Sequence, residues 1–346
     1  MSDRLRLSII GALCASLGLT ACGQPEQDSV VNVFSARHYA SDQEVFRAFT
    51  EETGIAINLV EADGDLLIER VRADGERSQA DVIITVDAGR LHRAEQAGLF
   101  QPAGDLGGML DRVPDALVHP DNLWFGFATR ARVIVYARDR VDPSEVQTYA
   151  DLARPEFEGR VCVRSSSNVY NQSLVAGMIA EDGVEAAESF ARGIAQNLAR
   201  TPQGGDTDQI RAVAAGECDV AIVNHYYLGR LLNASDNADR AVGEAVGIVF
   251  PDQGQGGTYV NISGAGLAAN APNPEAARAL LAFLLSERAQ RAFAELTNEF
   301  PADPSVSYDN TVLEGFAGFE ARDLNVNALG ENGAEAQRIF DRVGWP

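Results

Sequence analysis

Short apolar runs that alternate with helical segments constrain the fold of this chain more than any other feature. Residues 30–34, 55–60 and 81–86 are predicted β-strands, and residues 42–52 carry apolar side chains at helical spacing. This alternation is typical of α/β folds in which helices cover a largely parallel sheet. We therefore predict an α/β fold whose sheets are mixed, mostly parallel and flanked by helices.

The length of the chain, 346 residues, indicates two lobes rather than one small core. Residues 131–136 form a long β-rich run, which we expect to cross from one lobe into the other. Predicted strands at 160–164 and 218–223 then repeat the alternation. The predicted organisation is a signal peptide at 1–21, a tether at 22–30, lobe one at 31–131 and 255–305, and lobe two at 132–254 and 306–346.

The first residues resemble a bacterial export signal. Two arginines precede an apolar stretch at 7–19, which is too short to span a bilayer comfortably. Residues 19–22 are similar to a lipobox, which implies cleavage before Cys22 and attachment of lipid to that cysteine. An ordinary signal with a coincidental cysteine is the alternative. The polar residues 23–29 suit a tether.

Charge and motif content argue against two functional classes. The net charge of −22 argues against a nucleic-acid partner, because such proteins need a basic surface. The chain has no Gly-x-Ser-x-Gly elbow and no His-Glu-x-x-His helix, so we expect that it is not an enzyme.

Two cysteines, Cys162 and Cys218, remain in the exported part of the chain beside the predicted lipid site. Each begins a predicted strand, and adjacent parallel strands would bring them together. We predict a disulfide between them, because exported proteins enter an oxidising compartment. Two buried free thiols are the alternative.

Tyrosines follow three of the predicted strands. Tyr226 and Tyr227 come after the apolar run that ends at residue 223, Tyr170 follows the strand at 160–164, and Tyr39 follows the first strand. Ligands of open α/β sheets bind beyond the carboxyl ends of strands, so a ligand between the lobes would reach all of them. Packing of the rings with their hydroxyls in water is the alternative.

The chemistry of several phenols together indicates a hard, highly charged cation. An isolated phenol has a pKa near ~10 and is neutral at physiological pH, whereas a trivalent cation favours the phenolate. Zinc prefers Cys and His, and calcium prefers carboxylates and carbonyls, so tyrosines with His38 indicate Fe³⁺. Four phenolates on Fe³⁺ leave one negative charge, which we expect Arg130 to offset. The alternative for Arg130 is a surface or ion-paired residue.

Seven stretches spread over nearly the whole mature chain carry a family resemblance, and they are residues 35–39, 80–87, 129–136, 168–171, 202–209, 224–227 and 260–266. Together they resemble the periplasmic ferric-iron-binding proteins, the solute-binding components of iron(III) ABC importers. The resemblance implies a two-lobed, type II solute-binding fold that closes like a transferrin lobe.

The resemblance also implies the roles of individual residues. The family's iron ligands match Tyr39, Tyr170, Tyr226 and Tyr227, and His38 matches a position that ligates iron in only some members. Carbonate or water is a candidate additional ligand, and the His-Tyr start does not indicate an obligatory phosphate. The other histidines match no family ligand, so we expect His92 and His119 at the surface and His225 either beside the ligands or facing solvent.

The function that the resemblance implies is binding of ferric iron outside the cytoplasm and its delivery to an ABC permease. We expect a monomer in the periplasm or on the outer face of the cytoplasmic membrane, held to the membrane only by its lipid. A binding protein for another small solute, such as an anion, a polyamine or a sugar, is the alternative. A sugar site usually needs tryptophan faces, and the chain has only Trp124 and Trp345.

Overall fold

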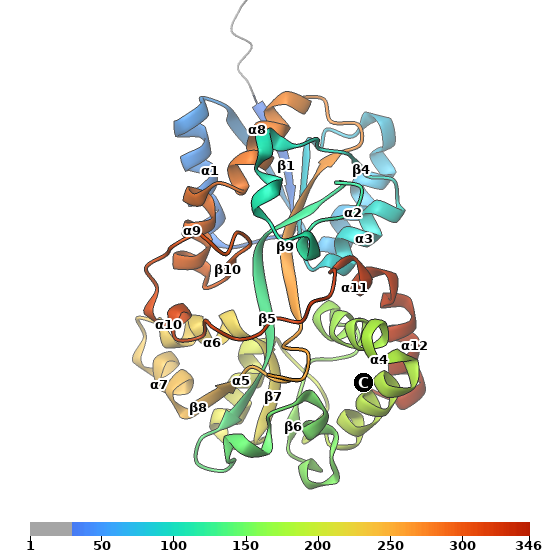
Figure 1. Cartoon of the computed structure of the whole chain (residues 1–346), viewed down its shortest axis with the longest axis vertical. Helices are drawn as coiled ribbons and strands as arrows, with labels where there is room; N and C mark the ends of the chain where they lie inside the picture. The colour runs from blue at the N-terminus through green and yellow to red at the C-terminus, as the bar shows by residue number, and fades with distance from the viewer. Residues whose placement is uncertain (1–29) are drawn as a thin grey trace, which may run out of the picture.

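The computed structural model describes residues 30–346, which form two lobes joined by extended strands. Figure 1 shows the lobes one above the other, with β5 (Phe125–Ala137) and β9 (Val260–Ala268) running between them. The predicted signal peptide and Cys22 lie outside the described residues. Within residues 30–346, every helix is too short or too polar to span a bilayer.

Lobe one is a sheet flanked by helices, in which the strand order is β2-β1-β3-β9-β5. Every residue of β3 (Val82–Val86) is buried, as expected for a Val- and Ile-rich strand covered on both faces. Its other elements are β1 (Val30–Ser35), β2 (Ala56–Glu61), β4 (Phe100–Gln101), β10 (Phe300–Pro301), α1 (Ala40–Thr53), α2 (Gly64–Asp74), α3 (Ala88–Gln96), α8 (Pro274–Leu284) and α9 (Glu287–Thr297).

Lobe two is built in the same way around the second half of β5. Strand β7 (Val220–Asn224) is fully buried and lies between β5 and β6 (Val161–Cys162). Helix α4 consists of two helical stretches that meet at a kink at Gly183, whose φ is 84°. The remaining elements are β8 (Val246–Val249), α4 (Val169–Gln196), α5 (Asp206–Ala215), α6 (His225–Leu232), α7 (Asn237–Ala245), α10 (Thr311–Glu314), α11 (Asn327–Glu331) and α12 (Gly333–Val343).

Strand β5 crosses between the lobes, as the run at 131–136 predicts. In lobe one it pairs with β9, where Arg130 lies opposite Asn261. In lobe two it pairs with β7, where Arg132 lies opposite Asn224. Because a single strand belongs to both sheets, its residues at the crossing are held at the boundary between the lobes.

The sheets are less parallel than predicted. Among the described residues, β1 pairs in parallel with β2 and β3, and β6 pairs in parallel with β7. The pairs made by β5 and β9 are all antiparallel. The alternation identifies the parallel βαβ units correctly, but it does not reveal that the two crossing strands run against their neighbours.

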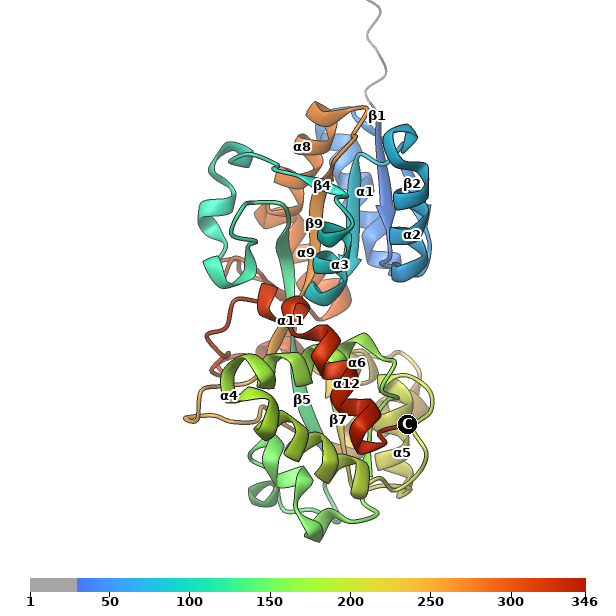
Figure 2. The same ribbon diagram turned by 90° about the vertical axis from the view of Figure 1, so that its right-hand side faces the viewer.

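The C-terminal segment returns to the boundary between the lobes. Figure 2 shows α11 at this boundary, with α12 beside α4 in lobe two. Val326 and Leu329 lie inside the range predicted for lobe two, but they pack into the core of lobe one. The chain therefore passes between the lobes once more near its end.

Candidate metal site

Four tyrosines from both lobes meet between the lobes. The hydroxyl of Tyr226 lies 3.4 Å from that of Tyr39 and 3.5 Å from that of Tyr170. The ring centres of Tyr226 and Tyr227 are 4.3 Å apart. The structure thus brings together all four tyrosines that the sequence singles out.

Each tyrosine stands at the start of a helix that follows a strand or loop at the boundary. Tyr39 is the N-cap of α1, Tyr170 is the second residue of α4, and Tyr226 and Tyr227 follow the first residue of α6. The N-terminus of a helix carries unpaired N–H groups and a partial positive charge. This field favours the ionised form of a phenol, so three helix ends support negative charge at one place.

Burial keeps the phenols of Tyr170, Tyr226 and Tyr227 protonated in the absence of a cation. The side chain of Tyr226 is fully buried, and burial raises its pKa far above the ordinary value of a phenol, with neighbouring phenols adding to the effect. Burial likewise raises the pKa of Tyr170 and of Tyr227. A group that ionises the cluster must therefore bring a strong local positive charge.

Two arginines stand behind the tyrosines and share one buried carboxylate. Arg130 donates to Glu299 Oε1 at 2.7 Å, and its guanidinium carbon lies 5.5 Å from the ring centre of Tyr226. Arg37 donates to Glu299 Oε2 at 2.8 Å, and its guanidinium carbon lies 4.7 Å from the ring centre of Tyr39. Arg130 is therefore both ion-paired and next to the site.

Glu299 remains ionised although it is fully buried. Burial alone would raise the pKa of Glu299, but the charges of Arg37 and Arg130 overcome this effect and hold the pKa at about 2. Ser263 donates a further hydrogen bond to Glu299 at 2.8 Å. The sequence gives no local signal for this network, because Arg37 and Glu299 are separated by 262 residues.

A third arginine, Arg230, faces the tyrosines from α6. Its guanidinium carbon lies 4.5 Å from the ring centre of Tyr39, 5.0 Å from that of Tyr226 and 5.4 Å from that of Tyr227. Arg230 follows Tyr226 by four residues on one helix, which places both on one face. This spacing is a signal from which the sequence could have identified Arg230.

His38 and His225 lie differently around the tyrosines, and His225 lies beside Tyr226, which is one of its two expected positions. The side chain of His38 is 52% exposed, its Nδ1 lies 3.6 Å from Glu61, and among the described residues it makes no hydrogen bond to a tyrosine. His225 is fully buried, so it does not face solvent. Its Nδ1 accepts a hydrogen bond from the backbone N–H of Ala131, and its Nε2 donates to the carbonyl of Asn298. Burial lowers the pKa of His225 to about 4.

The expectation that His119 lies at the surface is wrong. His119 is buried, its Nε2 lies 3.1 Å from Glu95, and its ring centre lies 5.2 Å from that of Trp124. His92 is also largely covered, because its side chain is only 16% exposed and approaches the same carboxylate. The ring of Trp124 packs against His119, and the carboxylate of Glu95, which comes from the earlier helix α3, lies beside its Nε2.

Other types of metal site are absent from the described part of the chain. Within residues 30–346, no three His, Cys, Asp or Glu side chains gather in a way that would hold a metal ion. Within these residues, the hypothesis of a metal site therefore depends on the tyrosine cluster. Phenolate oxygen, unlike thiolate or imidazole, suits a hard cation of high charge.

The two cysteines of lobe two lie at bonding distance. Cys162 ends β6 and Cys218 lies just before β7, and their Cα atoms are 5.9 Å apart, with the sulfur atoms 2.19 Å apart. Both side chains are buried. Parallel pairing of β6 with β7 is the reason that the two positions meet.

Comparison with known proteins places this chain in a family. A family model described as bacterial extracellular solute-binding protein matches residues 78–316. The chain belongs to this family. Iron uptake protein A1 of Synechocystis sp. is 44% identical to this solute-binding protein, and the match covers 100% of the chain and 99% of that relative.

Solved structures agree with the assignment to the solute-binding proteins. A Trichodesmium protein (IdiA, FutA) in complex with iron and citrate ligands has a TM-score of 0.87 and 46% identity, over 92% of this chain and 100% of that one. The ferric binding protein from Campylobacter jejuni has a TM-score of 0.87 and 37% identity, over 91% and 100%. The fold is therefore the two-lobed, type II fold that the sequence resemblance implies.

Proposed function

We propose that this solute-binding protein binds ferric iron outside the cytoplasm and delivers it to an ABC permease. The observation that carries the proposal is the meeting of four phenols from two lobes, with Tyr226 at their centre. Tyr39, Tyr170, Tyr226 and Tyr227 are the proposed ligands. Burial makes the phenols of Tyr170, Tyr226 and Tyr227 hard to ionise, and Fe³⁺ is a cation with enough charge to displace their protons.

The surrounding charges suit such a ligand set. Four phenolates and one Fe³⁺ together carry one negative charge, and the positive side chain of Arg130 contacts the ring of Tyr226 from behind. A guanidinium next to the ring of a tyrosine also stabilises the phenolate form of that tyrosine. Arg130 is therefore the proposed counter-charge, and His38 is a candidate additional ligand only if its exposed side chain turns toward the cleft. Carbonate or water is proposed as a further ligand.

Ligands from both lobes couple binding to closure. Tyr39 belongs to lobe one, and the other three tyrosines belong to lobe two. A ligand that contacts both lobes binds the closed form more tightly than the open form, and so it shifts the population toward closure. A permease can then distinguish the loaded from the empty protein by shape. We further propose a monomer in the periplasm or on the outer face of the cytoplasmic membrane, anchored by lipid at Cys22.

The structure weakens the alternative of another solute. Trp124 and Trp345 are both buried in hydrophobic cores, so neither offers a face on which a sugar would stack. Arg130 and Arg37 share the single carboxylate of Glu299, which leaves one positive charge between them, as much as the proposed iron complex requires. An enzymatic role has no support from the arrangement of the described residues, and transport binding is the simpler account.

The proposal is tested by titrating purified apoprotein with chelated Fe³⁺ and following the visible absorption of phenolate-to-iron charge transfer. We expect saturation at one iron per chain and a coloured complex. Tyr226→Phe should weaken binding and shift the band, whereas Tyr308→Phe, a control at a partly buried tyrosine outside the cluster, should change neither. Stoichiometric iron without a visible band would refute ligation by tyrosine.

A further inference from the structure

A buried hydrogen bond joins the two lobes close to the tyrosine cluster. Asp87 directly follows β3 in lobe one, and Ser173 lies on α4 in lobe two. Ser173 Oγ donates to Asp87 Oδ1 at 2.6 Å, and both residues are buried. This bond can form only while the lobes are together at this point.

The carboxylate of Asp87 is held in place from its own lobe. Its Oδ1 accepts from the backbone N–H of Gly89 at 2.8 Å, and its Oδ2 accepts from Asn261 Nδ2 at 2.8 Å. The side-chain oxygen of Asn261 in turn accepts from the N–H of Ala88. Asp87 itself adopts a φ of 88°, which is rare for a residue with a side chain. A strained backbone fixed by several partners indicates a position with a specific role.

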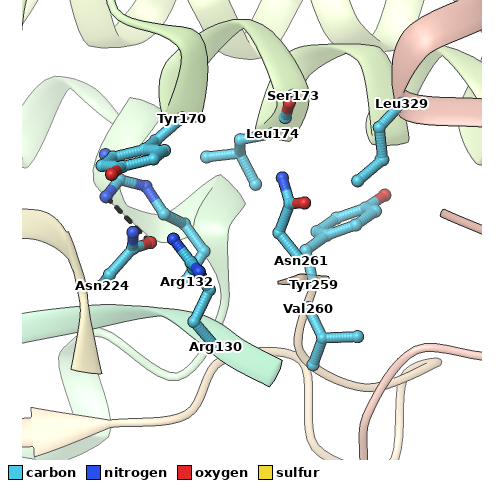
Figure 3. A pocket seen from close by; sticks show the side chains of 10 residues that line it. All are labelled: Arg130, Arg132, Tyr170, Ser173, Leu174, Asn224, Tyr259, Val260, Asn261 and Leu329. Carbon is cyan, nitrogen blue, oxygen red and sulfur yellow. Dashed lines mark hydrogen bonds between the residues drawn. The ribbon is translucent and has the colours of Figure 1, made fainter. Parts of the chain in front are cut away.

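Ser173 shares a helix face with one of the proposed iron ligands. It follows Tyr170 by three residues on α4, and residues at this spacing lie next to each other on a helix. Figure 3 shows Tyr170, Ser173 and Leu174 on this helix, above Arg132 and Asn261. Val86, the last residue of β3, packs against Tyr170 in the same place.

Close approach of the two lobes depends on a residue without a side chain. A Cβ atom at Gly89 would lie 3.4 Å from Ser173 Oγ and 3.0 Å from Asp87 Oδ1. The start of α3 can therefore approach α4 closely enough for the hydrogen bond to form. Gly89, Asp87 and Ser173 are not among the proposed iron ligands, so their arrangement calls for a separate explanation.

We propose that Asp87 and Ser173 form a latch that holds Tyr170 against the lobe-one side of the site and slows the release of the bound cation. The inference rests on the proposed iron-binding function. Opening the lobes would remove the Ser173 donor from Asp87 Oδ1 and leave that oxygen only the N–H of Gly89, so the closed form satisfies the carboxylate more fully. Hydrogen bonds to charged groups contribute enough to change an equilibrium roughly 10- to 100-fold.

The test compares the release of iron from the wild type and from Ser173→Ala, which removes one hydroxyl and leaves the partners of Asp87 in lobe one intact. Release to an excess of a strong iron chelator is followed by the loss of the charge-transfer band. We expect release to be at least about tenfold faster in Ser173→Ala, with little change in the rate of uptake. Ser167→Ala, an exposed serine just before the same helix, is the matched control.

A second substitution at Ser173 and a scattering measurement complete the test of the latch. Ser173→Cys retains the packing volume but offers a weak donor, so its release rate should fall between those of wild type and Ser173→Ala. Scattering of the iron-bound Ser173→Ala protein should show a larger radius of gyration than that of wild type. A wild type that binds no iron would overturn the proposed function, whereas iron-bound variants that release within about twofold of the control would overturn the latch alone.

Discussion

Replacement of Glu299 by Gln should destabilise the apoprotein because it removes the carboxylate between two buried arginines. Glu299 is fully buried and pairs with Arg37 at 2.8 Å and Arg130 at 2.7 Å. Its pKa falls from 4.5 to about 2 in the folded protein. At about 1.4 kcal/mol for each pKa unit, this difference corresponds to roughly 3 kcal/mol of stability at pH 7, within the range expected when one partner of a buried ion pair is lost.

The sign of the pH dependence follows from the lowered pKa. Because the unfolded state takes up the proton at higher pH than the folded state does, the stability from Glu299 is complete above about pH 5 and is lost as the pH falls from about 4.5 to about 2. The difference in stability between wild type and Glu299→Gln should therefore shrink from roughly 3 kcal/mol at pH 7 to roughly 1 kcal/mol at pH 3.

Urea unfolding of the apoprotein, followed by circular dichroism at a series of pH values, measures this difference. Glu275→Gln is the matched control, because that carboxylate is 89% exposed and should give a stability close to that of wild type at every pH. Equal stabilities of wild type and Glu299→Gln at pH 7 would refute the reasoning, and so would a difference that does not shrink in acid.

Three further predictions concern the metal site and the cysteines. Tyr39→Phe should lower iron affinity by tenfold or more and leave the protein less compact by small-angle scattering. His38→Ala should lower the affinity less, because neutral imidazole adds no negative charge to the site. A larger loss of affinity in His38→Ala than in Tyr39→Phe would contradict the ligand assignment. Iron should be released as the pH falls, because protons compete for phenols whose pKa is raised by burial, and retention unchanged well into acid, measured by the visible band, would argue against phenolate ligands. Non-reducing peptide mapping of the exported protein should recover Cys162 linked to Cys218, and two thiols that alkylate freely in the native protein would rule out the disulfide.

Local patterns were sufficient for much of the fold and for the proposed ligands. Buried strands such as Val82–Val86 and Val220–Asn224 are visible as apolar runs, and β5 is visible as a β-rich run between the two lobes. The tyrosines could be found because each follows a strand by a few residues, and the carboxyl ends of strands are where such folds bind ligands. These inferences need only neighbours in the sequence.

Local patterns failed where a residue's environment comes from a distant segment. The sequence places His119 at the surface, but it is buried beside the nearby ring of Trp124 and a carboxylate that comes from the separate helix α3. The sheets that the alternation predicts to be mostly parallel are interrupted by β9, which pairs antiparallel with β3 and β5. The contact of His119 with α3 and the direction of β9 could not be inferred without knowing the path of the chain.

The sequence by itself determined the α/β alternation and the residue types that favour ferric iron, because periodicity and motif spacing are properties of neighbouring residues. The family followed from the resemblance of seven stretches spread along the chain. The tertiary structure alone decided how the charged and polar groups around the phenols are paired. Arg130 reaches Glu299 across 169 residues, and Ser173 reaches Asp87 across 86. Such pairs are stable only because the fold buries them together, where a charge or donor without its partner would be strongly unfavourable.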